Sequence, residues 1–122
     1  MKRDMELIRK LLFYFEEKPD SSHVQVPPIE GHGESDIRYH CRLLYDAGFL
    51  NCEPVASSTS SRVIYVIPFD LTWAGHEFLD KIRADSTWNK IKAQAKEKSL
   101  SLSFNIVNEL AQRLTLAAIS GA

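Results

Sequence analysis

The stretch that most constrains the fold of this chain is residues 37–50, IRYHCRLLYDAGFL. Ile37, Cys41 and Leu44 recur at the spacing of one helix face, so the stretch predicts a helix whose apolar stripe faces a core. Four other side chains lie off that stripe, namely Arg38, Tyr39, Arg42 and Tyr45. Gly48 suits the left-handed position that ends a helix, and an apolar pair after it begins an extended run.

This short helix with two exposed arginines, followed by AGFL, resembles the third helix and second strand of winged helix-turn-helix proteins. In that fold the helix usually enters the major groove of DNA. The resemblance implies that Arg38, Tyr39 and Arg42 read base edges. Ser35 and Arg62 are then expected to position the duplex through its backbone.

Length and composition predict a single soluble core rather than a membrane or secreted protein. The chain has 122 residues, 44% of them hydrophobic and 25% charged. It contains no signal-peptide pattern, and no run approaches the roughly 18 apolar residues that span a bilayer. The two cysteines, Cys41 and Cys52, do not make a disulfide framework, and Cys41 is expected in the core. We therefore expect a cytoplasmic protein with no membrane partner.

The charge distribution argues against a simple DNA binder. The chain has fifteen Lys and Arg residues and sixteen Asp and Glu residues, which gives a net charge of −1. No global positive field is therefore expected to attract a polyanion. Residues 21–70, which contain the expected reading helix, hold three basic and six acidic residues, a net −3. Residues 71–98 hold six basic and four acidic residues, a net +2. Basic charge thus lies beside the motif rather than on it.

Residues 4–17 predict the first core helix, because their apolar positions follow helical spacing. Asp4 is available as its N-terminal cap, and Pro19 ends the run. Lys2 and Arg3 precede the helix. They are either phosphate contacts or two solvated charges at a mobile end of the chain.

Residues 20–35 depart from the winged-helix pattern. We expect a small first strand at residues 23–26, between Ser21, Ser22 and a proline pair. The second helix has room only for a stub at residues 28–33, and the prolines and glycines there disfavour even that. The second helix normally braces the reading helix, so a shortened second helix is a real departure from the winged-helix pattern.

A β-hairpin is expected next. Residues 49–55 read as extended, residues 62–69 (RVIYVIPF) form a β-branched and aromatic run, and residues 56–61 (ASSTSS) form a polar loop. This hairpin would be the wing. Arg62 at its base is either a contact to a minor groove or phosphate, or an ordinary surface arginine. Pro68 is expected to limit the second strand.

Residues 70–80, DLTWAGHEFLD, predict a helix that Thr72 caps, with Gly75 allowing close packing against a strand. Together with MKRDMELIRK, YHCRLLYDAGFL and residues 88–98, this segment resembles an uncharacterised, prophage-associated bacterial family of short winged-helix proteins. The resemblance implies the fold and a bacterial or phage origin, and it brings no activity or catalytic residue. We therefore predict an α+β fold: a winged helix-turn-helix with a shortened second helix, a small antiparallel sheet and additional C-terminal helices.

Two further helices are expected at the C-terminus. Residues 85–98 place Trp88 on a buried side, with lysines that either touch nucleic acid or are simply solvated. Residues 104–119 form an amphipathic helix. We expect a homodimer held partly by Phe104, Leu110 and Leu114, with folding back onto the first helix as the alternative. The expected domains are residues 1–84, the winged-helix domain, and residues 85–122, a helical extension packed on it or on a second subunit.

The residues predict no catalytic, metal or cofactor site. The four histidines are scattered, and His40 and Cys41 lack the i, i+4 spacing of a metal-binding helix pair. His40 is expected to be a hydrogen-bonded helix residue. Two functions remain: a small DNA-binding transcriptional regulator that binds double-stranded DNA, or a protein-interaction module on the same scaffold without nucleic-acid binding.

Overall fold

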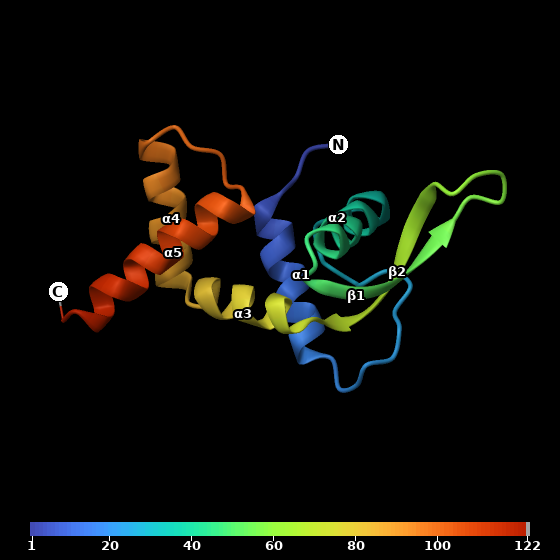
Figure 1. The fold of residues 1–122 in the computed structure, drawn as a ribbon, viewed down its shortest axis with the longest axis horizontal. Coiled ribbons are helices and arrows are strands. Elements are labelled where there is room, and N and C mark those ends of the chain that lie inside the picture. The colour runs from blue at the N-terminus through green and yellow to red at the C-terminus, as the bar shows by residue number, and fades with distance from the viewer. Residues whose placement is uncertain (122) are drawn as a thin grey trace. The chain divides into compact units, whose positions relative to one another are not determined.

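The chain forms five helices and one antiparallel hairpin over residues 1–121, the part that this computed structural model describes (Figure 1). In chain order the elements are α1 (Met5–Glu17), α2 (Glu34–Asp46), β1 (Leu50–Ala56), β2 (Val63–Leu71), α3 (Trp73–Ile82), α4 (Asp85–Glu97) and α5 (Phe104–Ile119). The α+β class is confirmed. Contacts divide the chain into two units, Met1–Glu77 and the residues from Phe78 onward, so the boundary lies within α3.

Helix α1 forms the centre of the first unit's core. Its side chains Leu7, Ile8, Leu11 and Leu12 are buried, as their helical spacing predicts. The Asp4 carboxylate caps the helix by accepting hydrogen bonds from the backbone N–H groups of Glu6 at 2.9 Å and Leu7 at 3.3 Å. The predicted cap is confirmed.

Helix α2 begins at Glu34, before the stretch that predicted it, and packs against α1 and the hairpin. Ile37, Cys41 and Leu44 are buried, so the predicted apolar stripe is confirmed. Gly48 follows with a φ of +81°, the left-handed conformation expected of a glycine that ends a helix.

The hairpin β1–β2 is confirmed, and its tip extends away from α2 (Figure 1). The expectation that Pro68 limits the second strand is wrong, because β2 continues to Leu71. Cys52 pairs with Pro68 and Asn51 pairs with Asp70, which leaves Phe69 as an extra residue in β2. Such a bulge is one of the places within a sheet that tolerate a proline without an N–H group.

The strand expected at residues 23–26 and the helical stub expected at residues 28–33 are both wrong. Within residues 1–121 the sheet has two strands, and residues 18–33 form an irregular connection with a turn near Gly31. One backbone bond, from the Val24 N–H to the Pro68 oxygen at 3.0 Å, ties this connection to β2. Pro27 and Pro28 lack the N–H groups that a ladder or a helix needs, so the pairing stops there.

The start of α3 is fixed against the start of the hairpin. The Thr72 hydroxyl accepts from the Gly75 N–H at 3.0 Å and donates to the Gly48 oxygen at 2.6 Å. A Cβ on Gly75 would lie 2.1 Å from the Phe49 oxygen. Both sequence predictions for this helix, the Thr72 cap and the close approach at Gly75, are confirmed.

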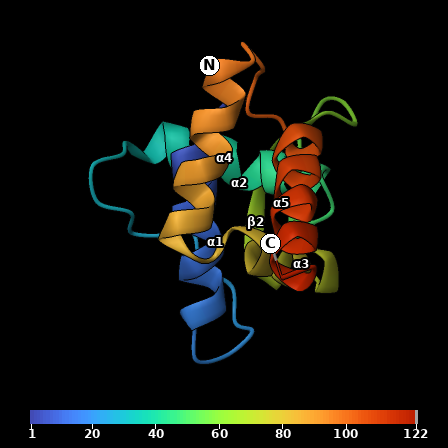
Figure 2. The ribbon, with the colours of Figure 1, turned by 90° about the vertical axis from the view of Figure 1, so that its left-hand side faces the viewer.

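The second unit consists of the end of α3 together with α4 and α5, which lie side by side (Figure 2). Trp88, Ile91 and Ala95 of α4 are buried, as predicted. The Ser103 hydroxyl caps α5 by accepting from the Ile106 N–H at 3.2 Å. The two predicted C-terminal helices are therefore present: α5 has the predicted bounds, and α4 ends at Glu97, one residue before its predicted end.

Candidate nucleic-acid interface

The polar side of α2 and strand β2 enclose a hollow of about 440 Å³ on the surface of the first unit. Helical spacing brings four side chains of α2 to this hollow, because positions i, i+3, i+4 and i+7 share one side of a helix. These residues are Ser35, Arg38, Tyr39 and Arg42. Four of the five residues predicted to contact DNA are thus brought together in one place.

Arg38 is held in a defined orientation. Its Nε donates a hydrogen bond to Glu34 Oε1 at 3.1 Å, one helical turn earlier. Its guanidinium carbon lies 5.0 Å from the centre of the Tyr65 ring, a distance typical of a cation–π contact. The side chain keeps 31% of its surface exposed, so Arg38 is preorganised without being buried.

Arg42 is less constrained than Arg38. Its Nε lies 3.8 Å from Asp46 Oδ2, which is within ion-pair range but too long for a hydrogen bond. Its side chain is 42% exposed. Each arginine of the hollow therefore has a carboxylate neighbour on α2, and exposed pairs of this kind contribute little stability.

Arg62 does not line the hollow. It precedes β2 at the hairpin loop, where its backbone N–H donates to the Ser60 hydroxyl at 3.2 Å and its oxygen accepts from the Ser57 N–H at 2.8 Å. Its side chain is exposed, and no residue within 1–121 forms an ion pair with it. Arg62 therefore lies apart from the α2 cluster.

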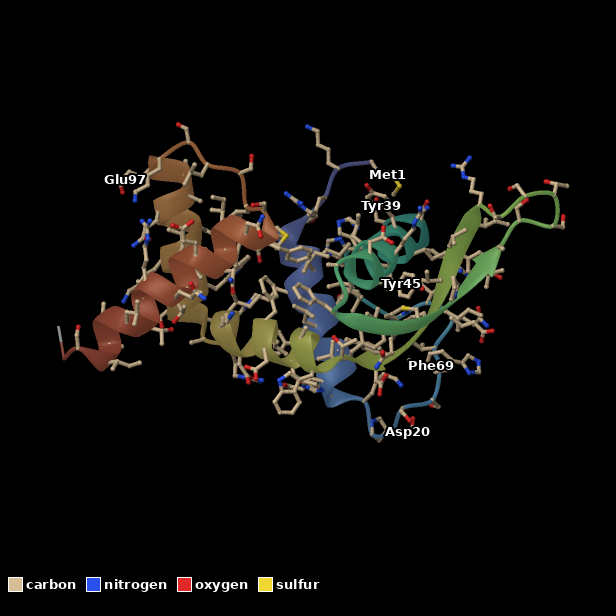
Figure 3. The ribbon with its side chains drawn as sticks, viewed as in Figure 1. Met1, Asp20, Tyr39, Tyr45, Phe69 and Glu97 are labelled. Carbon is tan, nitrogen blue, oxygen red and sulfur yellow. The ribbon has the colours of Figure 1, made fainter. Side chains whose placement is uncertain are left out.

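Three residues that line the hollow were missed by sequence reasoning. Ile64 and Tyr65 come from β2, and Met1 lies beside Tyr39 (Figure 3). The run RVIYVIPF was assigned only to a strand, although an aromatic residue on a half-exposed strand is a common signal of a binding surface. Helix and strand come together only through tertiary packing, so the Arg38–Tyr65 contact has no local sequence signal.

His40 is the buried polar residue of α2, with 1% of its surface exposed. Its Nε2 accepts a hydrogen bond from the Asp4 N–H at 2.8 Å, and its Nδ1 lies 2.7 Å from the Asp36 oxygen. Since Nε2 accepts, we assign the proton to Nδ1, which then donates to Asp36. The prediction that His40 is a hydrogen-bonded helix residue is confirmed, and its bond to Asp4 joins the start of α1 to α2.

The two thiols are poorly suited to nucleophilic chemistry. Burial raises the pKa of Cys41 to about 12, with a smaller contribution from nearby Cys52. Burial also raises the pKa of Cys52 to about 12, and Asp70 adds to the shift. A thiol with such a pKa is almost entirely protonated near neutral pH, and the protonated form is not the nucleophile.

Within residues 1–121 no group of three or more His, Cys, Asp and Glu side chains is arranged to hold a metal ion. In the same range, none of the helices combines the length and apolar character needed to cross a bilayer.

The residues expected at a dimer interface lie on α5. One of them contacts another residue of the second unit, and a second one is buried. Phe104 packs edge-on against Phe78 with ring centres 5.1 Å apart, and Leu110 is buried. Leu114 is half-buried, and Leu116 and Ile119 near the end of α5 are exposed.

The chain is similar to a protein family and to a bacterial protein. The family model described as "Hypothetical protein (DUF2513)" matches residues 2–101. An uncharacterised protein of Haemophilus influenzae is 36% identical over 115 residues, which cover 93% of this chain and 95% of that protein. No solved structure matches the chain.

Proposed function

The chain belongs to the hypothetical-protein family DUF2513, and from that premise we propose that it binds double-stranded DNA as a winged-helix variant. In this proposal α2 enters the major groove and the hairpin lies against the neighbouring backbone. The observation that carries the proposal is the cluster of Ser35, Arg38, Tyr39 and Arg42, which line one hollow beside β2. We further propose a small transcriptional regulator of bacterial or prophage origin.

The residue types of the cluster support this proposal. Arginine and tyrosine both donate hydrogen bonds to base edges or phosphates, and arginine binds guanine in a bidentate manner. Arg62 adds an exposed cation at the hairpin loop. The irregular connection at residues 18–33 replaces the bracing helix of a standard helix-turn-helix, and the His40–Asp4 bond supplies a different tie between α1 and α2.

Binding to a randomised pool of DNA duplexes tests the proposal. Fluorescence anisotropy at low ionic strength should show binding that weakens linearly with the logarithm of salt concentration, because bound arginines release counterions. Arg42→Ala should cost about 1–3 kcal/mol of binding and relax base preference at one position. Absence of salt-sensitive binding to every duplex would refute the proposal.

A second candidate function is protein interaction without DNA binding, and the charge of the first unit favours it. Residues 1–77 carry eight basic and twelve acidic side chains, a net −4. Glu34 and Asp46 also lie beside the two arginines of the hollow. Tyrosine and arginine are enriched where protein partners bind tightly, so the same hollow suits a protein surface.

A photo-crosslinking amino acid at position 39 separates the two functions. Tyr39 lines the hollow, so a reactive group there labels whatever occupies it in cells. DNA binding predicts crosslinks that nuclease removes. Protein interaction predicts crosslinks that resist nuclease and disappear with protease.

A further inference from the structure

Arg38 occupies a different position on α2 from the other polar residues of the hollow. Ser35, Tyr39 and Arg42 lie opposite the buried stripe of Ile37, Cys41 and Leu44, so they form the outermost face of the helix. Arg38 lies on the flank toward β2, where its guanidinium meets Tyr65. A base edge in the major groove meets the outermost face first, so the flank is a poor place from which to read bases.

The contacts of Arg38 also leave donors available. Glu34 accepts only from Nε, and Tyr65 contacts the face of the guanidinium. Within residues 1–121 neither terminal nitrogen of Arg38 has a hydrogen-bond partner. A guanidinium fixed at Nε and at its face, with the Nη groups available, can present two N–H donors to an oxyanion.

We infer that Arg38 binds a phosphate group of the DNA backbone in the hollow between α2 and β2, while the outermost face of α2 meets the bases. This inference rests on the proposed DNA binding. A phosphodiester carries two non-bridging oxygens that match a forked pair of N–H donors. Tyr65 of β2 also lines the hollow, and a tyrosine hydroxyl group can donate a hydrogen bond to a phosphate.

The Glu34 carboxylate opposes an anion but does not exclude one. The Arg38–Glu34 pair is on the surface, with side-chain exposures of 31% and 66%. A pair this exposed is weakly held and strongly screened by solvent. A phosphate can therefore share the guanidinium with Glu34, which keeps Nε while the phosphate takes the Nη groups.

The test compares Arg38→Ala, Arg38→Lys and a matched control across a panel of duplexes at several salt concentrations. Arg113→Ala is the control, because Arg113 also donates to a glutamate one turn away, Glu109 Oε1, at 2.8 Å. Arg38→Ala should weaken binding to all duplexes alike, by about tenfold. It should also reduce the slope of log affinity against log salt by about 0.9, the share of one phosphate.

The Lys variant and the control define the remaining expectations. Arg38→Lys should keep the salt slope, because the charge remains, and should lose part of the affinity with the forked geometry. Arg113→Ala should leave both quantities unchanged. Circular dichroism of each variant shows whether it keeps the wild-type fold.

The outcomes that overturn the inference differ from those that overturn DNA binding. If the wild type binds duplexes and Arg38→Ala relaxes preference at one base while the salt slope stays the same, Arg38 is a base reader and the inference is wrong. An Arg38→Ala protein that binds like the wild type removes Arg38 from the contact altogether. If the wild type binds no duplex, DNA binding itself fails and the inference falls with it.

Discussion

At the scale of single residues, His40 shows how one buried polar side chain joins two helices. Both ring nitrogens are hydrogen-bonded to backbone atoms, to the Asp4 N–H at 2.8 Å and the Asp36 oxygen at 2.7 Å. A buried imidazole costs free energy unless such partners are present, so the pair of bonds explains why α2 tolerates histidine on its inner side.

Replacing His40 should therefore destabilise the fold more than replacing an exposed histidine. His40→Ala removes the acceptor for the Asp4 N–H and the donor to Asp36, with an expected cost of about 1–3 kcal/mol in the free energy of unfolding. His76→Ala is the control, because His76 is exposed and should change stability by no more than about 0.5 kcal/mol. Urea unfolding followed by circular dichroism measures both, and equal effects would contradict a structural role for His40.

At the scale of secondary-structure elements, the junction of β1 and α3 depends on a glycine. Among the glycines of the first unit, Gly75 lies closest to another part of the backbone. Gly75 faces the Phe49 backbone, and Thr72 ties the same junction to Gly48. The strand entry and the helix start thus approach more closely than any residue with a Cβ allows.

Gly75→Ala should destabilise the protein although alanine is the better helix former. An added Cβ would lie 2.1 Å from the Phe49 oxygen, a backbone atom that cannot rotate away. Overpacking of this kind typically costs about 1–3 kcal/mol, which outweighs the gain of about 1 kcal/mol from helix propensity.

Gly33→Ala provides the matched control for Gly75→Ala. A Cβ at Gly33 meets nothing within 4 Å, and this residue precedes α2 with an ordinary negative φ of −76°. Its cost should stay below about 1 kcal/mol. Thermal unfolding compares the two, and a Gly75→Ala protein as stable as the wild type would show that α3 can move away from β1.

At the scale of the whole molecule, charge and exposed apolar surface are unevenly distributed along the chain. Residues 1–77 carry a net −4 and the residues from Phe78 onward a net +3, from seven basic and four acidic side chains. Helix α5 ends in uncharged turns where Leu116 is 65% exposed and Ile119 is 76% exposed. These turns therefore leave large apolar side chains uncovered at the end of α5.

We expect a homodimer in which Leu114 and the exposed end of α5 contact a second chain. Light scattering at micromolar concentration should give twice the chain mass of 13.9 kDa for the wild type. Leu116→Glu should give the single-chain mass, because a buried carboxylate without a partner is costly.

Leu100→Glu is the control for the dimer, because Leu100 is also exposed, at 41%, but lies outside α5. It should leave the dimer mass unchanged. A single-chain mass for the wild type would refute the homodimer, and a dimer mass that survives Leu116→Glu would remove this end of α5 from the interface.

The amino-acid sequence by itself determined the features that depend on neighbouring residues. Helical spacing and the caps at Asp4 and Thr72 located the starts of α1 and α3, which the structure confirms. Gly48 is predicted to end a helix, because a backbone position in the left-handed region favours glycine in any fold, and its φ is positive in the structure. Each of these signals acts over a few residues, so the local chemistry is sufficient.

Only the tertiary structure decided the features that join distant segments. The connection at residues 18–33 is irregular rather than strand and helix, and β2 passes Pro68 through a bulge set by its pairing with β1. His40 meets a backbone group 36 positions away, and Arg38 meets Tyr65 across two elements. The energy of such contacts depends on the packing of α2 against α1 and β2, and residue order alone does not specify that packing.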